Sequence, residues 1–273
     1  MVLLQEKLAQ LRKAGKAILA ANFYNLETLQ GVLRSASALN APIILQLSEG
    51  SIHYIGLKTA AQMAFSALKE FNVEGWLHLD HGASYELAAK CLDEGFNSVM
   101  IDASEKPFGE NVKITKEVVK LAEKYKANVE AELGFVAKLG QSNEGRGFTQ
   151  PDEAFEFVNA TGVHALAVAI GSAHGFYKQT PKLEIELLSK ISRKVQIPLV
   201  LHGASGIPDE MLREAIKNGI TKINLATETK NTFMKELKNL LLNTDEIDLR
   251  KVFPKAIDAV TTLITNKIKV ISL

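Results

Sequence analysis

The stretch Trp76-Leu77-His78-Leu79-Asp80-His81-Gly82 is a short apolar run that ends abruptly in an acid, an imidazole and a glycine. Side chains alternate between the two faces of a strand, so its two leucines share one face while His78 and Asp80 share the other. His81 then lies where the chain leaves the strand. The stretch therefore predicts a strand whose carboxyl end presents polar groups.

Two further apolar runs, residues 167–175 and 198–203, also finish in a His-Gly pair. Eight strand-like runs in all alternate with segments of helical period. The runs lie at about residues 17–22, 42–47, 75–80, 98–102, 127–133, 164–170, 197–202 and 221–225. Helix signals agree with this alternation, because Pro and acids begin the helices predicted at Pro151 and Pro208 and glycines follow helical stretches. These glycines are Gly15, Gly95, Gly162 and Gly219.

Eight parallel strands alternating with helices in about 250 residues are typical of a closed (β/α)8 TIM barrel, an α/β fold. The competitor is an open doubly wound sheet, which would need a Gly-rich phosphate loop after the first strand. Residues 20–23 supply none. We therefore predict one barrel domain over residues 1–273, with C-terminal helices from about residue 228 onward.

Composition excludes several classes of protein. The 273 residues are 47% hydrophobic with a net charge of +1, which gives no global field for nucleic acid or an anionic membrane. The lone Cys91 cannot form an internal disulfide, and the N-terminus lacks the apolar segment of a signal peptide. No run reaches about 20 apolar residues. We expect a cytoplasmic protein with no nucleic-acid or membrane partner.

Every predicted strand ends in a polar side chain. Active sites of barrel enzymes lie at this carboxyl-terminal face, so such a ring of groups indicates chemistry. A single polar residue at a strand end is ordinary. It is unusual, however, that three of only six histidines lie at strand ends and that each is followed by Gly. The strand-end groups are Asn22, Ser48, Asp80 with His81, Asp102, Glu132, His174, His202 and Asn224.

The imidazoles of His81, His174 and His202 would converge from the third, sixth and seventh strands. Three histidines suffice to hold a catalytic divalent metal, zinc above all, with an open position for water or substrate. Asp80 directly precedes one of them and would face the same cavity, where it could transfer protons to the substrate. The alternative is a carboxylate that orients an imidazole.

Glu130 and Glu132 share one face of the fifth strand and therefore point into the barrel. Buried carboxylates need partners, and Lys222 on the last strand is one candidate, with the metal or a histidine as another. In a second interpretation, Lys222 is a nucleophile that attacks a ketone substrate and forms a Schiff base. Its place two residues below the strand end argues against that role.

Small, donor-rich turns follow the last strands at residues 171–175, 203–206 and 224–227. Barrels commonly bind phosphate there with backbone N–H groups and a helix N-terminus. The three turns therefore predict a phosphate site.

Taken together, these motifs resemble the class II, metal-dependent ketose-bisphosphate aldolase family, whose members act on fructose or tagatose bisphosphate. The similarity spans essentially the whole chain. The matching segments are residues 22–27, 46–50, 78–82, 98–104, 129–134, 171–175, 199–206 and 222–228, and the tail 248–251 with Pro254.

The resemblance implies reversible cleavage of a ketose 1,6-bisphosphate to dihydroxyacetone phosphate and glyceraldehyde 3-phosphate, with Zn²⁺ or another divalent metal stabilising the enediolate. Asp80 would protonate the nascent hydroxyl in condensation and remove that proton in cleavage. Na⁺ or K⁺ beside the phosphate is also implied. The metal ligands would be His81, His174 and His202, with Asp102 and Glu132 as supporting or alternate ligands. The substrate and phosphate would contact Asn22, Ser48, Gly175, Gly203, Ser205, Asn224 and Thr227.

The chain departs from the family in residues 137–147, where the usual pattern has paired glycines followed by acids and a mobile proton-transferring glutamate. Glu144 is the nearest carboxylate and the candidate for that role. Ala226 resembles the tagatose-type members, which favours tagatose 1,6-bisphosphate or a promiscuous enzyme. Two alternatives are a metal-dependent sugar-phosphate epimerase or isomerase and an aldolase for another phosphorylated aldehyde. Family members are commonly homo-dimers or homo-tetramers, in which Arg250 could reach a neighbouring site.

Overall fold

The computed structural model describes residues 2–136, 147–177 and 179–272. Within these residues eight parallel strands pair in sequential order, and the last closes on the first to form a barrel. The predicted fold is confirmed. The strands are β1 (Ile18–Asn22), β2 (Ile43–Ser48), β3 (Gly75–Gly82), β4 (Ser98–Ile101), β5 (Asn128–Leu133), β6 (Ala165–Val168), β7 (Leu199–Leu201) and β8 (Ile220–Leu225).

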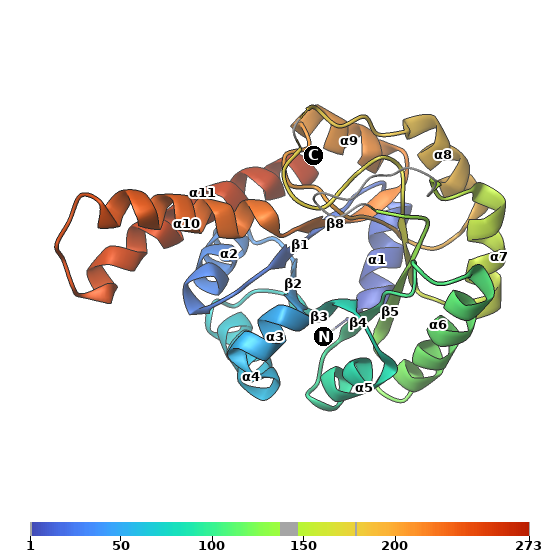
Figure 1. Cartoon of the computed structure of the whole chain (residues 1–273), viewed down its shortest axis with the longest axis horizontal. Helices are drawn as coiled ribbons and strands as arrows, with labels where there is room; N and C mark the ends of the chain where they lie inside the picture. The colour runs from blue at the N-terminus through green and yellow to red at the C-terminus, as the bar shows by residue number, and fades with distance from the viewer. Residues whose placement is uncertain (1, 137–146, 178, 273) are drawn as a thin grey trace.

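The described residues also form eleven helices, most of which pack around this barrel (Figure 1). They are α1 (Leu4–Lys13), α2 (Leu26–Ala38), α3 (Glu49–Ile55), α4 (Leu57–Glu70), α5 (Tyr85–Asp93), α6 (Phe108–Glu123), α7 (Pro151–Thr161), α8 (Ile185–Lys194), α9 (Asp209–Lys217), α10 (Thr227–Leu241) and α11 (Leu249–Ile271). None of them is long and apolar enough to cross a membrane.

Local sequence sets the helix ends. Asn25 and Ser84 cap α2 and α5, because their side chains accept hydrogen bonds from backbone N–H groups three residues later. Pro151 is the first residue of α7, and Gly162 ends that helix in the left-handed conformation, as predicted. Pro208 instead lies one residue before α9.

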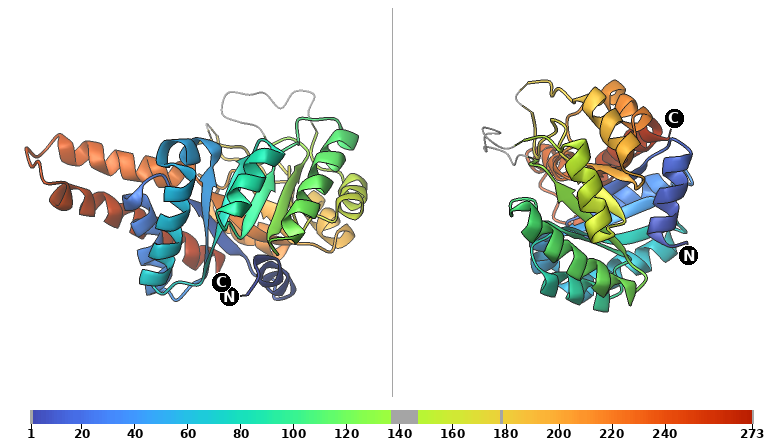
Figure 2. Two further views of the ribbon diagram at one scale, coloured as in Figure 1. Left: turned by 90° about the horizontal axis from the view of Figure 1, so that it is seen from below. Right: turned by 90° about the vertical axis from the view of Figure 1, so that its right-hand side faces the viewer.

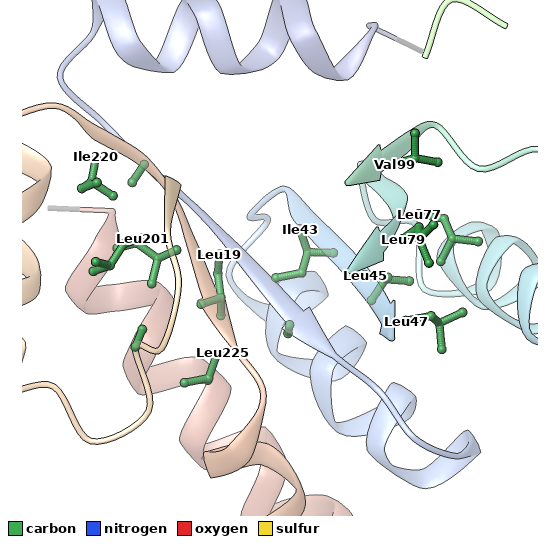
Figure 3. Close-up of a cluster of buried hydrophobic side chains, with 14 of the residues drawn as sticks. Leu19, Ile43, Leu45, Leu47, Leu77, Leu79, Val99, Leu201, Ile220 and Leu225 are labelled. Atoms are coloured by element: carbon green, nitrogen blue, oxygen red, sulfur yellow. The ribbon is translucent and has the colours of Figure 1, made fainter. Parts of the chain in front are cut away.

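The alternation within each strand divides the core in two. Leu77 and Leu79 of β3 face the helices and join the outer core between barrel and helices (Figure 3). Trp76 faces inward with Ile44 and Val200 and forms a smaller apolar cluster inside the barrel. Helix α1 contributes Leu4 and Leu8 to this cluster, and the Trp76 indole donates to the Val2 carbonyl at 3.0 Å.

The last two helices leave the barrel. Figures 1 and 2 show α10 and α11 running side by side to a tip well beyond the barrel wall. We call their outer ends, with the connecting residues 242–248, the arm. The carboxyl-terminal part of α11 returns to pack on α2, where Gly31 allows Val260 to approach closely.

The largest differences from the predicted strands are in β6 and β7, which are each three residues shorter, and in β3, which is two residues longer. Strands β6 and β7 end before the Gly-rich turns, where the Ala173 N–H and the Gly203 carbonyl both bond to the Tyr177 hydroxyl. Strand β3 continues two residues further, to Gly82, and this extension shapes the site.

Candidate metal centre and active site

Strand β3 carries a bulge at its carboxyl end. Its register with β4 shifts between Leu79 and Gly82, and His81 takes a positive φ of 50°. A side chain in this left-handed region costs about 1–2 kcal/mol, so the surrounding structure holds it there. Strict alternation would send Asp80 and His81 to opposite faces. The bulge lets both consecutive side chains reach the mouth of the barrel.

The structure brings together the three histidines that the sequence singles out. The potential ligand atoms of His81, His174 and His202 all lie within 4.8 Å of one another. Nε2 of His81 and Nδ1 of His202 are 2.9 Å apart. A tetrahedral zinc ion, with Zn–N distances of about 2.0–2.1 Å, places its ligand nitrogens about 3.3 Å apart, so the cluster fits a divalent metal.

Carboxylates fix which nitrogen each of two imidazoles presents. Asp102 Oδ2 lies 2.7 Å from Nδ1 of His81, and Glu130 Oε1 lies 2.8 Å from Nε2 of His202. Each carboxylate accepts the N–H of its ring, which leaves the opposite nitrogen free to bind a metal. Asp102 is held in turn by the backbone N–H and hydroxyl of Ser104.

Glu132 also lies near His202 but, unlike Asp102 and Glu130, does not hold an imidazole by a short hydrogen bond. Its Oε2 is buried, has no hydrogen-bond partner in the part of the chain that the structure describes, and lies 3.8 Å from Nδ1 of His202. Burial and the charge of Asp102 raise the pKa of Glu132 to about 8. An unpaired buried oxygen next to the convergent histidines fits a carboxylate that can approach a bound cation.

A polar layer lies directly below the three histidines. Lys222 Nζ donates to Glu130 Oε2 at 2.8 Å, which confirms the predicted pairing, and lies 3.4 Å from Nε2 of His78. Nδ1 of His78 contacts the Ser98 hydroxyl at 2.7 Å. Burial and the nearby Lys222 charge lower the pKa of His78 to about 3, so its ring is neutral. His78 is thus an inward residue of this second layer, as predicted.

Two amides hold the carboxylate of Asp80. Asn22 Nδ2 donates to Oδ2 at 2.8 Å, Asn224 Nδ2 lies 3.4 Å from Oδ1, and Gln46 in turn donates to Asn22 at 2.9 Å. Burial acts to raise the pKa of Asp80. The positive charges of His81 and its neighbours and the hydrogen bond from Asn22 outweigh this effect, so the pKa lies below its ordinary value.

A small pocket opens beside Asp80 and His174. It is lined by the predicted phosphate positions Gly175, Gly203, Ser205 and Thr227, together with Asn22 and Asn224. The Ser205 hydroxyl accepts the backbone N–H of Glu228 in the first turn of α10, so this turn and the helix N-terminus are joined.

Tyr177 ties the loops of this pocket together. Its hydroxyl accepts from the Ala173 N–H and donates to the Gly203 carbonyl, both at 2.8 Å. Gly203 has a φ of +69°, and a Cβ there would meet the Ala173 oxygen. Sequence reasoning missed Tyr177 and Gln46. The only signals were a tyrosine just after the His174 turn and an amide on the inward face of β2.

Two predicted site residues lie away from this pocket, and a third is outside the part of the chain that the structure describes. Ser48 stands opposite Asp80 in the register of β2 and β3, but its hydroxyl caps α3 and it does not line the pocket. Arg250 is exposed on the arm, where its guanidinium pairs with Asp248. Glu144 lies outside the described residues.

Comparison with known proteins identifies the family behind this geometry. The family model described as fructose-bisphosphate aldolase class-II matches residues 2–273. The chain belongs to this family. Class II aldolases are metal-dependent lyases, and the convergent histidines of the present chain agree with that chemistry. The class I alternative, with Lys222 as the nucleophile, is wrong.

Sequence relatives and solved structures agree with the family model. The fructose-bisphosphate aldolases of Geobacillus stearothermophilus and of Staphylococcus aureus (strain Mu50) are each 40% identical, over 275 and 277 residues, covering 98% of this chain and 96% of theirs. The YdjI aldolase of Escherichia coli K12 superposes with a TM-score of 0.89 at 34% identity, covering 98% and 96% of the two chains. A putative fructose-1,6-biphosphate aldolase from Coccidioides immitis gives 0.88 at 28%, covering 97% and 94%.

Proposed function

We propose that this class II aldolase reversibly cleaves a ketose 1,6-bisphosphate to dihydroxyacetone phosphate and glyceraldehyde 3-phosphate. The observation that carries the proposal is the convergence of three imidazoles with Asp80 next to a pocket of phosphate-binding character. The family implies sugar phosphates as substrates, and the sequence relatives named above are fructose-bisphosphate aldolases.

The phosphate shared with dihydroxyacetone phosphate would bind at Gly175, Gly203, Ser205 and Thr227. The small residues leave backbone N–H groups open to phosphate oxygens, and the N-terminus of α10 adds a favourable dipole. Asn224 would hold the triose part of the substrate close to Asp80. A monovalent cation, Na⁺ or K⁺, beside this phosphate belongs to the same proposal.

We assign Zn²⁺ to the site formed by His81, His174 and His202, with Asp102 and Glu132 as supporting or alternate ligands. When bound, a divalent metal supplies Lewis-acid stabilisation of the negative charge that develops on the ketone-derived oxygen of the substrate. The chain's own part is to fix the imidazoles, and it does so through Asp102 and Glu130.

Asp80 is the proposed proton carrier. In cleavage its carboxylate takes the proton of the C4 hydroxyl, the C3–C4 bond breaks and the aldehyde forms. In condensation Asp80 returns that proton. A carboxylate with a lowered pKa is ionised at neutral pH, and the amides of Asn22 and Asn224 keep it aimed. Glu144 remains the proposed residue for the proton at the enediolate carbon.

Fructose and tagatose bisphosphates differ in configuration at C4, the carbon whose hydroxyl meets Asp80. Ala226, which lines the pocket, favours the tagatose type, whereas the sequence relatives favour fructose. We propose that the protein accepts tagatose 1,6-bisphosphate and also fructose 1,6-bisphosphate. Values of kcat/KM for both epimers, measured on one sample of known metal content, test this choice. Cleavage of fructose bisphosphate alone would contradict it.

The epimerase or isomerase alternative has a different product. A coupled assay for triose phosphates, run beside chromatography of the sugar phosphates, separates the two reactions. Triose phosphates are expected, and an epimer formed without triose phosphates would refute the aldolase proposal.

We also propose a homo-dimer or homo-tetramer in which Arg250 contacts phosphate in a neighbouring subunit. The exposed position of Arg250 on the arm supports this role. Light scattering gives the assembly size. If Arg250 acts across subunits, Arg250→Ala raises KM at unchanged assembly size, whereas an unchanged KM counts against the role.

A further inference from the structure

A second cavity lies at the opposite end of the barrel from the histidines. It has a volume of about 360 Å³, within the range of small-molecule sites. Its walls are the turn after α1, the end of α8 and the turn between α9 and β8. In Figure 2, α1 and the N-terminus lie at this end of the barrel.

Four cations line this cavity: Arg12, Lys16, Arg193 and Lys217. The lining contains no carboxylate among the described residues, although the whole protein has a net charge of only +1. Of the four, the side chains of Lys16, Arg193 and Lys217 have no ion-pair or hydrogen-bond partner within the described ranges. Local charge here is therefore strongly positive and uncompensated.

The guanidinium of Arg12 is held in place by hydrogen bonds, but not all of its N–H groups have a partner among the described residues. Its Nη2 donates to the carbonyls of Ser192 and Val195 at 3.0 and 2.9 Å, and its Nη1 donates to Gln196. Its Nε is buried and has no hydrogen-bond partner among the described residues. A guanidinium held in place by two backbone carbonyls and flanked by the serines at 189 and 192 is a typical component of a phosphate site.

In the turn between α9 and β8, the backbone packs closely against the end of α8. Gly219 has a φ of +118°, and a Cβ there would meet the Ser192 side chain at 2.1 Å. Cations near helix ends also offset the helix dipole. That effect does not account for a cavity of this size whose titratable lining residues are all cationic.

We propose that this cavity binds a small polyanion with two phosphate groups, at a second site separate from the catalytic one. Four cations match the charge of such a ligand, and the cavity volume admits a compact bisphosphate. The inference does not depend on which ketose the active site cleaves.

A suitable probe is propane-1,3-diol bisphosphate, a simple bisphosphate with little tendency to remove a metal. Calorimetric titration of the metal-loaded protein at low ionic strength is expected to show two sites per chain. The double variant Arg193→Gln/Lys217→Gln is expected to bind at least tenfold more weakly at one site and to retain its cleavage kcat and KM. Added salt is expected to weaken binding at this site.

The matched control is Lys120→Gln/Lys124→Gln, which removes two exposed lysines from another pocket that also contains Glu86 and Glu117. This control should keep both sites. One site per chain in the wild type, an unchanged isotherm for the Arg193/Lys217 variant, or an equal loss in the control would each overturn the proposal. The single variant Arg193→Gln, expected to weaken binding about threefold, replaces the double variant if circular dichroism shows that the latter is misfolded.

Discussion

At the scale of single residues, the bulge at His81 lets two consecutive side chains serve different roles. His81 is the proposed metal ligand, and Asp80 is the proposed proton carrier. Period-two reasoning from the sequence places Asp80 inward but gives no reason for His81 to face the same cavity. The positive φ of His81 and the register shift against β4 supply that reason. A bulge depends on pairing with a neighbouring strand, so no local pattern predicts it.

The first prediction concerns Asp80. Asp80→Ala should retain the metal and lower turnover by about 10²- to 10⁴-fold, because proton transfer is lost while the imidazoles stay in place. Metal analysis and cleavage kinetics on the same preparation measure both quantities. Asn224→Ala is a useful comparison, since it keeps the Asp80 carboxylate and removes the neighbouring amide proposed to hold the substrate. Wild-type turnover in Asp80→Ala would refute the assignment.

Glu130 should act through His202. Glu130→Gln is expected to weaken metal binding about 10- to 100-fold, because the ring of His202 loses the carboxylate that fixes its tautomer. The same change leaves Lys222 buried without a carboxylate, which also costs stability. The double variant Glu130→Gln/Lys222→Met should therefore recover stability but not metal affinity. Recovery of both would show that the effect on the metal is only a consequence of lost stability.

The pH dependence of metal binding follows from His81. In the metal-free protein burial opposes protonation, but the hydrogen bond to Asp102 and nearby carboxylates raise the pKa of His81 to about 9. A metal needs the neutral ring, so binding at pH 7 displaces a proton from His81, and apparent affinity should rise with pH until about 9. Calorimetry with chelator-buffered Zn²⁺, in buffers of different ionisation enthalpy, counts the protons. An affinity that does not change between neutral pH and that value would contradict this reading.

At the scale of elements, Gly31 of α2 sets the distance to α11. A Cβ at this position would meet Val260 Cγ1 at 2.6 Å and the Ile257 carbonyl oxygen at 3.1 Å. Gly31→Val should therefore destabilise the protein by about 1–3 kcal/mol through overpacking. Urea unfolding measures the change.

Gly109 of α6 provides the matched control for Gly31. A Cβ there would meet nothing within 4 Å, so Gly109→Ala should leave stability unchanged or slightly improved. Equal stability of Gly31→Val and wild type would mean that α11 is free to move away from α2.

The elements themselves were largely predictable from periodicity. All eight strands appear within a few residues of the predicted runs, because inward and outward positions differ in polarity and glycines punctuate the helices. The length of β6 was not predictable. Residues 169 and 170 are as apolar as a strand, yet Ala169 bonds to Thr149 in the loop after β5 rather than to β7.

At the scale of the whole molecule, the barrel interior changes from apolar to reactive along its axis. Trp76 and its apolar neighbours fill the end near α1, the layer of His78, Glu130 and Lys222 follows, and Asp80 lies at the mouth. The polar layer orients part of the metal centre above it, since Glu130 holds His202. This order follows from alternate residues of single strands, so β3 alone already displays it in sequence.

The arm was the least predictable part of the molecule. C-terminal helices from about residue 228 onward are predicted, but no local signal encodes their projection beyond the barrel or the packing of α11 on α2. The pairing of Glu130 with Lys222 across the barrel, in contrast, followed from the cost of burying a charge.

Metal dependence is tested most directly by triose-phosphate release from a ketose 1,6-bisphosphate before and after metal removal, with metal content measured on each sample. We predict one divalent metal per chain, loss of activity with EDTA and recovery with Zn²⁺. Cleavage that persists at full rate in the metal-free protein would contradict this prediction.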